Sequence, residues 1–208
     1  EVTAILTAGS ENYFDVKTSI VNKTDEPALS LSFPATLAFK PQRVKRVLFP
    51  FRFGLEFNRN FFLLKKGARE TYPTCFIDYL GISLENGDLA VYALKDRDRF
   101  QPADLSVGFE SAGGGFGICG HTMPAYVKTG KEHVFPTIRF RVGQNLESTL
   151  EDYRVDCGID KFSSLSEKIG GNFDRYSGGI LFKVDMGGNK DFKAVTEMLG
   201  EIPEGTNL

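Results

Sequence analysis

Residues 47–57 read Val-Leu-Phe-Pro-Phe-Arg-Phe-Gly-Leu-Glu-Phe, and this stretch decides the fold class. Every second residue in it is large and apolar: Val47, Phe49, Phe51, Phe53, Leu55 and Phe57. Because successive side chains of a β-strand point to opposite faces, the spacing predicts a single strand with one apolar face. Burying each of these side chains stabilises the fold by roughly 1.5–3 kcal/mol, so a second apolar layer should lie opposite.

Shorter alternating segments recur on both sides of this stretch. They predict further strands over residues 14–20, 29–33, 75–79, 82–84, 89–94, 105–109 and 135–142. The turn cluster at 22–27 suggests a hairpin or a sandwich edge, and Asn86-Gly87-Asp88 predicts a tight turn because Asn and Gly tolerate positive φ. The glycine-rich residues 111–117 predict a loop. Many short strands separated by turns indicate a mainly β chain, with a two-layer antiparallel β-sandwich over residues 1–144.

The pattern changes after residue 144, where helical spacing replaces alternation. Asn145 can cap a helix with Leu146, Leu150 and Tyr153 on one face, and a capping box begins a second short helix at Ser164. The sequence also predicts a strand over residues 180–184 and a helix over 191–200. Residues 145–208 are therefore predicted to be a small α/β connector that leads away from the sandwich.

Composition narrows the classes of partner. The chain has 208 residues, a formal net charge of −2 and nineteen phenylalanines without one tryptophan. A nearly neutral chain gives no electrostatic reason to expect nucleic acid or an anionic membrane as a partner. No apolar run reaches the length of a membrane-spanning helix. Most of the phenylalanines should belong to the core, since their side chains carry no polar group.

Cysteine and histidine spacing predicts neither a metal centre nor a cofactor. Cys75, Cys119 and Cys157 are odd in number and far apart, with no CxxC and no zinc-ligand spacing. Buried free thiols are the main expectation, and one disulfide plus a spare thiol is the alternative for an exported protein. Asn22-Lys23-Thr24 also fits the glycosylation sequon, although a solvated turn is the simpler interpretation.

A series of short motifs resembles a known family. Their order along the chain is 52–56 (Arg-Phe-Gly-Leu-Glu), 72–73 (Tyr-Pro), 87–92 (Gly-Asp-Leu-Ala-Val-Tyr) and 150–154 (Leu-Glu-Asp-Tyr-Arg). This order resembles the N-terminal β-supersandwich, or galactose-mutarotase-like, domain of large glycoside hydrolases, especially predicted glycosidases related to endo-α-N-acetylgalactosaminidases. The resemblance implies a non-catalytic domain that supports a C-terminal (β/α)₈ barrel, which would carry the catalytic carboxylates. It also favours export to the periplasm or the cell exterior, which the sequence alone does not decide.

Several polar and aromatic residues are candidates for contact with a saccharide or with a neighbouring domain. They are Arg52, Glu56, Tyr72, Tyr79, Asp96 and Arg97, with Tyr92 as a third tyrosine able to stack on a sugar ring. Arg52 and Glu56 are expected on one sheet face, four residues apart. For each residue the structural alternative is an ordinary surface ion pair, a solvated turn or core packing.

Two other functions stay open at this point. A free-standing carbohydrate-binding module would show exposed tyrosines lining a cleft. A mutarotase-like sugar epimerase would need a histidine and a carboxylate converging on a sugar, and only His121 and His133 are available, with Glu110 or Glu132 as partners. Both histidines fall in the polar region 111–134, where solvated loop positions are expected. A cupin-type metal site would need a close His-x-His pair, which this sequence lacks.

Overall fold

The computed structural model describes residues 1–9, 11–35, 37–50, 55–58, 67–72, 75, 77–94, 103–110 and 115–170. The chain divides into two compact units, Glu1–Asp160 and Lys161–Leu208. The boundary predicted between residues 144 and 145 falls inside the first unit, which contains both sheets and the first described helix. None of the helices in the described ranges is long and apolar enough to cross a membrane.

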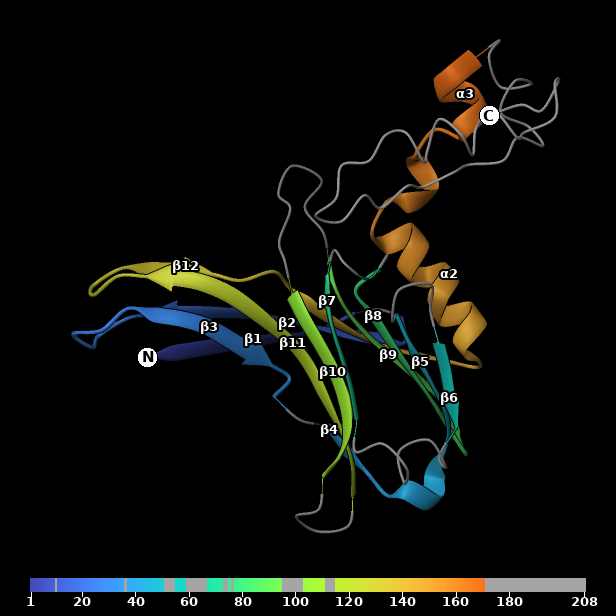
Figure 1. Ribbon diagram of the computed structural model, residues 1–208, viewed down its shortest axis with the longest axis horizontal. Coiled ribbons are helices and arrows are strands. Elements are labelled where there is room, and N and C mark those ends of the chain that lie inside the picture. Colours follow the sequence, from blue (N-terminus) through green and yellow to red (C-terminus); the bar gives the residue numbers. More distant parts are fainter. Residues whose placement is uncertain are drawn as a thin grey trace, which may run out of the picture. The chain divides into compact units, whose positions relative to one another are not determined.

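The larger sheet has eight antiparallel strands in the order β1-β2-β13-β9-β8-β5-β6, and β12 pairs with β2 as well (Figure 1). Its strands are β1 (Val2–Ala8), β2 (Tyr13–Val21), β5 (Val44–Phe49), β6 (Leu55–Asn58), β8 (Tyr79–Leu84), β9 (Gly87–Ala93), β12 (Glu132–Val134) and β13 (Ile138–Gly143). Strands distant in sequence are therefore neighbours in this sheet.

The smaller sheet has five antiparallel strands in the order β3-β11-β10-β7, with β4 paired to β11. These strands are β3 (Ala28–Phe33), β4 (Leu37–Phe39), β7 (Gly67–Tyr72), β10 (Ala103–Glu110) and β11 (Gly115–Val127). A short 3-10 turn, Pro41–Arg43, leads from β4 into β5 of the larger sheet. The predicted fold class, mainly β with antiparallel sheets in a sandwich-like arrangement, is confirmed.

The stretch at 47–57 folds back on itself, so the prediction of one continuous strand is wrong. β5 ends at Phe49, before Pro50, which has no N–H to continue a ladder. β6 returns antiparallel from residue 55, with Val47 opposite Phe57. Since paired residues point to the same face, Val47 and Phe49 of β5 and Phe57 of β6 still reach one layer. Residues 51–54, which include Phe51 and Phe53, lie outside the described part of the chain.

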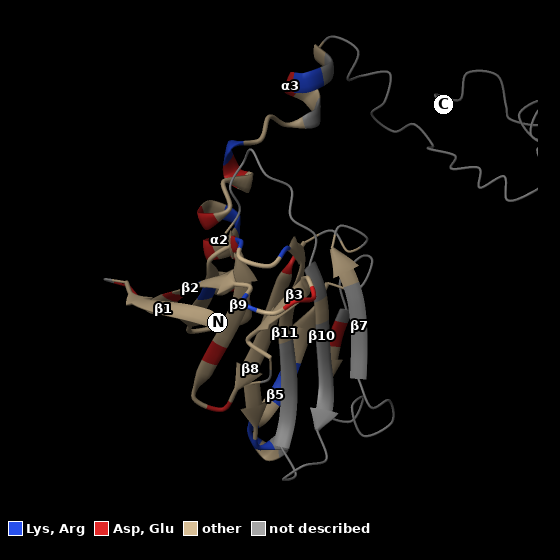
Figure 2. Cartoon of the chain, turned by 90° about the vertical axis from the view of Figure 1, so that its left-hand side faces the viewer, with Lys and Arg blue, Asp and Glu red and all other residues tan. Residues whose placement is uncertain are grey.

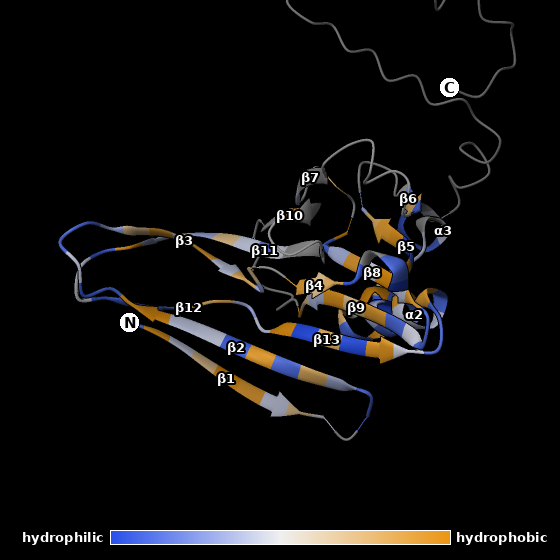
Figure 3. Ribbon diagram, turned by 90° about the horizontal axis from the view of Figure 1, so that it is seen from below, coloured by the Kyte–Doolittle hydropathy of each residue, from blue (hydrophilic) through white to orange (hydrophobic). Residues whose placement is uncertain are grey.

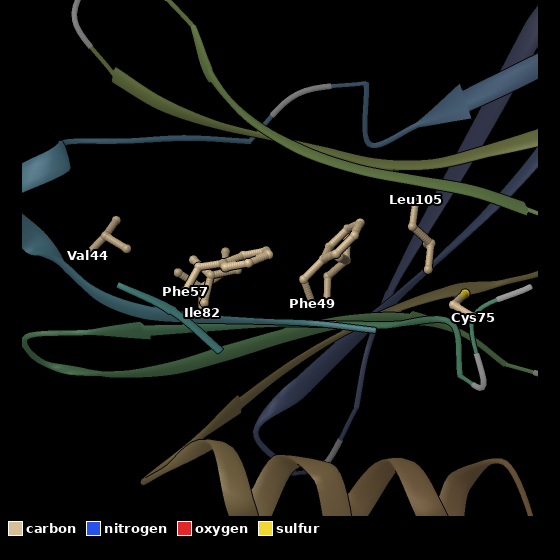
Figure 4. Packing of buried hydrophobic residues seen from close by; sticks show 8 residues of the cluster. Val44, Phe49, Phe57, Cys75, Ile82 and Leu105 are labelled. Carbon is tan, nitrogen blue, oxygen red and sulfur yellow. The ribbon is translucent and has the colours of Figure 1, made fainter. Parts of the chain in front are cut away.

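The core lies between the two sheets in two clusters. In the first, Val44, Phe49, Phe57 and Ile82 extend from the larger sheet and Leu105 approaches them from β10 (Figure 4). The second cluster joins residues of β2, β9 and β13 to residues of β11 and to Phe135: Val16, Ile20, Val91, Ala93, Ile138, Phe140 and Met123. Burial on both inner faces explains the apolar alternation in these strands.

The segment between β2 and β3 connects the two sheets, so of the two predicted alternatives it agrees with the sandwich edge and not with the hairpin. β2 pairs with β1 and β13, whereas β3 pairs with β11. The buried Asn22 organises this connection, because its Nδ2 donates hydrogen bonds to the carbonyl oxygens of Glu26 and Val127, both at 2.8 Å. Its amide is therefore occupied by the fold and does not present a glycosylation site at the surface.

Two other local predictions have different outcomes. The hairpin of β8 and β9 is confirmed, with Leu84 paired to Gly87 and the turn at Glu85 and Asn86. The loop predicted over 111–117 is wrong from Gly115 onward, because β11 begins there and pairs with β10. Glycine-rich sequence has low strand propensity, and pairing with β10 on one side and with β3 and β4 on the other outweighs that preference.

Helix α2 (Leu146–Asp156) packs on the outer face of the larger sheet through Leu146, Thr149 and Tyr153. Asn145 caps it as predicted, since its side chain accepts a hydrogen bond from Ser148 N at 2.7 Å. In the second unit, the predicted capping box of Ser164 and Glu167 begins α3 (Leu165–Ile169). The strand and helix predicted over 180–200 lie outside the described residues.

Candidate functional site

Two arginines on β13 lie on the outer face of the larger sheet and pair with acidic residues of α2. Along β13 the apolar Ile138 and Phe140 alternate with Arg139 and Arg141, which gives the banded colouring of this strand in Figure 3. The apolar pair enters the core, and the arginines emerge on the face that α2 covers. Figure 2 shows that α2 carries several acidic residues.

Arg139 joins β13, β2 and α2. Its Nε and Nη2 donate to the two carboxylate oxygens of Asp15, each at 2.8 Å, and its Nη1 lies 2.9 Å from Oδ2 of Asp156. Its guanidinium carbon also lies 3.8 Å from the ring centroid of Tyr13. Hydrogen bonding to Asp15, the largest cause, raises the pKa of Arg139 above its ordinary value. These contacts make Arg139 a structural clamp between sheet and helix.

Arg141, two residues after Arg139 on β13, also links this strand to α2. Its Nε donates to Oδ2 of Asp152 at 2.8 Å, and its Nη1 donates to Oε2 of Glu11 at 3.1 Å. The hydrogen bond from Arg141 holds the pKa of the Asp152 carboxyl below its usual range. Asp152 therefore stays ionised at neutral pH and accepts hydrogen bonds, rather than acting as a proton donor.

An open pocket of about 430 Å³ lies beside Arg141. The β1–β2 turn, the end of β13 and one side of α2 form it, through Glu11, Asn12, Arg141, Val142, Gly143, Gln144, Ser148 and Asp152. Carboxylate oxygens accept hydrogen bonds, side-chain amides both donate and accept, and the Ser148 hydroxyl can do either. This set of groups is suited to an uncharged ligand with several hydroxyl groups.

Tyr79 and Tyr92 lie beneath α2 rather than in a cleft. Tyr79 is only 2 % exposed, stacks on Tyr92 with ring centroids 6.1 Å apart, and meets Tyr153 edge-on at 5.6 Å. The hydroxyl of Tyr92 donates to Oδ2 of Asp156 at 2.6 Å. Desolvation raises the pKa of all three tyrosines. Their rings pack the helix onto the sheet, so the faces proposed for sugar stacking are covered by protein.

Of the other predicted candidates, the structure describes Glu56 and Tyr72, which lie in different sheets. Glu56 is exposed on β6, and its Oε2 lies 3.2 Å from Nη1 of Arg46, which also bonds to Glu147 of α2. Tyr72 ends β7 of the smaller sheet and packs, half-buried, against the first core cluster. None of Glu56, Tyr72 and Tyr79 lines the pocket. Arg52, Asp96 and Arg97 lie outside the described residues.

The two histidines occupy strands and do not line the pocket. His121 is fully buried in β11, with its Nε2 3.1 Å from the carbonyl oxygen of Asp78, so the expectation of a solvated loop is wrong for this residue. His133 lies in β12, half-buried, with its ring edge-on to Phe135 at 4.7 Å. Within the described ranges, no group of three or more His, Cys, Asp or Glu residues could hold a metal ion.

Cys75 and Cys157 are buried, and their thiols donate to the carbonyl oxygens of Ile77 at 3.2 Å and Ala93 at 3.7 Å. The side chain of Cys119 is outside the described part of the chain.

Sequence reasoning missed the residues that line the pocket, because they come from three separate segments. The only local signals were the Arg-x-Arg alternation at 139–141 and Asp152 within the Leu-Glu-Asp-Tyr-Arg motif.

No protein-family model matches this sequence, and no curated protein is significantly similar to it.

Proposed function

We propose that this chain is a non-catalytic accessory domain of a glycoside hydrolase and that it binds carbohydrate in the pocket beside Arg141. The observation that carries the proposal is the lining of this pocket, where carboxylate, amide and hydroxyl groups from three segments converge. The antiparallel two-sheet fold supports it further, because the resemblance in the sequence implies a fold of this kind. The association with a catalytic barrel rests on that resemblance alone.

The pocket is lined by two carboxylates and one guanidinium, which disfavours an anionic saccharide. Arg141 is already shared between Asp152 and Glu11, so its charge is compensated before any ligand arrives. Asn12 and Gln144 can each bind two neighbouring hydroxyl groups through one amide. Because Arg141 keeps Asp152 ionised, Asp152 does not have the raised pKa that a glycosidase needs in its general acid. The pocket therefore suits recognition better than hydrolysis.

Glycan binding by the purified chain tests the proposal. We expect binding to at least one member of a panel of neutral oligosaccharides, measured by calorimetry, and at least tenfold weaker binding after Asn12→Ala or Gln144→Ala. Glu151→Gln is the matched control, since Glu151 is exposed on α2, pairs with Arg154 and does not line the pocket. Absence of binding across the panel, or equal losses in the control, would contradict the proposal.

A second assay tests the accessory role in the polypeptide that carries the catalytic domain. Gln144→Ala should lower turnover of polymeric substrate and leave turnover of a small soluble glycoside unchanged. An equal loss on both substrates would assign the pocket to catalysis instead.

A further inference from the structure

Strand β1 forms one edge of the larger sheet in the part of the chain that the structure describes. It is the terminal strand in the sheet order and pairs with β2 alone among the described strands (Figure 3). All seven of its residues are exposed, including Val2 (59 %), Ile5 (58 %) and Leu6 (65 %). Its sequence, Val-Thr-Ala-Ile-Leu-Thr-Ala, contains no charge and no proline. Edge strands normally carry charged residues or proline, which prevent pairing with another chain. β1 has neither, so nothing in its sequence prevents such pairing.

The hydrogen bonds to β2 identify which backbone groups face outward. Glu1 and Val21 exchange two hydrogen bonds, each of 2.9 Å, and Gly9 N donates to Tyr13 O at 3.1 Å. In an antiparallel ladder, hydrogen-bonded pairs alternate with pairs that make no backbone hydrogen bonds. Because Glu1 and Gly9 are bonded to β2, the other odd-numbered residues of β1 bond to β2 as well. The N–H and C=O groups of Val2, Ala4, Leu6 and Ala8 therefore point to the open edge.

We propose that a second copy of this chain pairs with β1 about a two-fold axis at Ile5, which makes one continuous antiparallel sheet across two protomers. Only residues in the same bonding state can pair, so even-numbered residues must lie opposite even-numbered ones. With the axis at Ile5, Val2 pairs with the second copy's Ala8 and Ala4 with its Leu6, each pair occurring twice. This register uses every outward-facing backbone group of the strand.

The side chains are also self-complementary in this register. Ile5 faces its own symmetry copy at a position without backbone hydrogen bonds, where opposing side chains come closest, and Thr3 lies opposite Thr7. On the other face the even-numbered residues continue the apolar surface of β2, because Val2 and Leu6 are the ladder partners of Ile20 and Val16. The pairing thus extends an apolar face that β1 leaves exposed, and like charges are absent from the contact.

Introducing a charge at the axis provides the test. Sedimentation velocity of the wild-type chain should show a concentration-dependent dimer. Ile5→Lys and Ile5→Glu should each weaken dimerisation at least tenfold, since each places two like charges face to face, and an equimolar mixture of the two should dimerise again. Leu29→Lys is the control, because Leu29 is equally exposed (63 %) on β3 of the other sheet. A monomeric wild type, or a dimer that Leu29→Lys disrupts and Ile5→Lys does not, would overturn the proposal.

Cysteine crosslinking tests the register. Ile5→Cys should form a disulfide-linked dimer under mild oxidation, and Thr3→Cys should not, because Thr3 lies opposite Thr7 rather than itself. Crosslinking of Thr3→Cys alone would place the axis elsewhere and contradict the proposed register. Circular dichroism identifies any variant that has lost its fold.

Discussion

The hydroxyl of Tyr79 lies 2.7 Å from Oγ1 of Thr149, and both side chains are buried between β8 and α2. Thr149 Oγ1 also bonds to the carbonyl oxygen of Leu146 at 3.0 Å, so one hydroxyl connects sheet and helix. Tyr79, which the sequence suggests as a residue for stacking on a sugar ring, therefore holds α2 against the sheet.

Thr149→Val tests this anchor. The substitution keeps the shape of the side chain and removes the hydroxyl, leaving the Tyr79 hydroxyl only a longer contact of 3.4 Å to Leu146 O. We expect the free energy of unfolding to fall by about 1–2 kcal/mol in urea titrations. Thr149→Ser retains the hydroxyl and should lose less. A larger loss in Thr149→Ser than in Thr149→Val would mean that the methyl group, not the hydroxyl, holds the helix.

The three tyrosines beneath α2 predict a loss of stability in alkali. Burial raises the pKa of Tyr79, Tyr92 and Tyr153 above the ordinary value of about 10. The folded chain therefore keeps protons that the unfolded chain releases. Their contribution is fully present below pH 10 and declines as the pH rises above it.

Urea unfolding at pH 8 to 11, together with tyrosinate absorbance, measures this effect. We expect the unfolding midpoint to fall above pH 10 and part of the tyrosinate signal to appear only on unfolding. Simultaneous ionisation of all tyrosines near pH 10 in the folded protein would contradict the assignment.

The alternation of apolar and polar residues predicts most of the strands and the two-layer class, because a strand buried on one face has an apolar residue at every second position. It could not predict the reversal after Phe49, since Val47 and Phe57 reach the same face whether the chain continues or turns back. Strand β1 was also missed. Both of its faces are exposed, so no burial pattern marks it.

The polar site was less predictable than the sheets. Glu11 is far in sequence from Gln144 and Asp152, and it meets them only because the β1–β2 turn, the end of β13 and α2 are neighbours in space. His121 illustrates the converse case, in which a glycine-rich setting suggested a loop and strand pairing placed the residue in the core. Pairing partners of this kind cannot be read from a local pattern.

The Arg139 clamp should contribute far more to stability than a surface ion pair. Its side chain is 11 % exposed and serves both Asp15 and Asp156. Arg139→Gln would leave two largely buried carboxylates without their cation, and we expect a loss of about 3 kcal/mol in the free energy of unfolding. The exposed Arg154, paired with Glu151 one helical turn away, is the matched control. Arg154→Gln should leave the urea midpoint unchanged. Similar losses in the two variants would show that the Arg139 pairs are no stronger than surface contacts.

Gly81 in β8 lies where the sheet packs against Leu146 of α2. A Cβ at this position would lie 2.8 Å from Cε1 and 2.9 Å from the hydroxyl oxygen of Tyr79, and 3.1 Å from Cδ2 of Leu146. Gly81→Ala must therefore displace Tyr79, which is fixed between Tyr92 and the helix. We expect a loss of about 1–3 kcal/mol, measured by urea unfolding, because overpacking forces buried side chains from their positions.

A double mutant separates this steric effect from simple loss of strand propensity. Leu146→Ala removes one of the obstructing side chains, so Gly81→Ala should cost less in that background than in the wild type, giving a measurable coupling energy. Equal costs in both backgrounds would show that contact with Leu146 does not determine the need for glycine. Amide exchange in α2 gives an independent readout, since displacement of Tyr79 should lower the protection of the helix relative to β9.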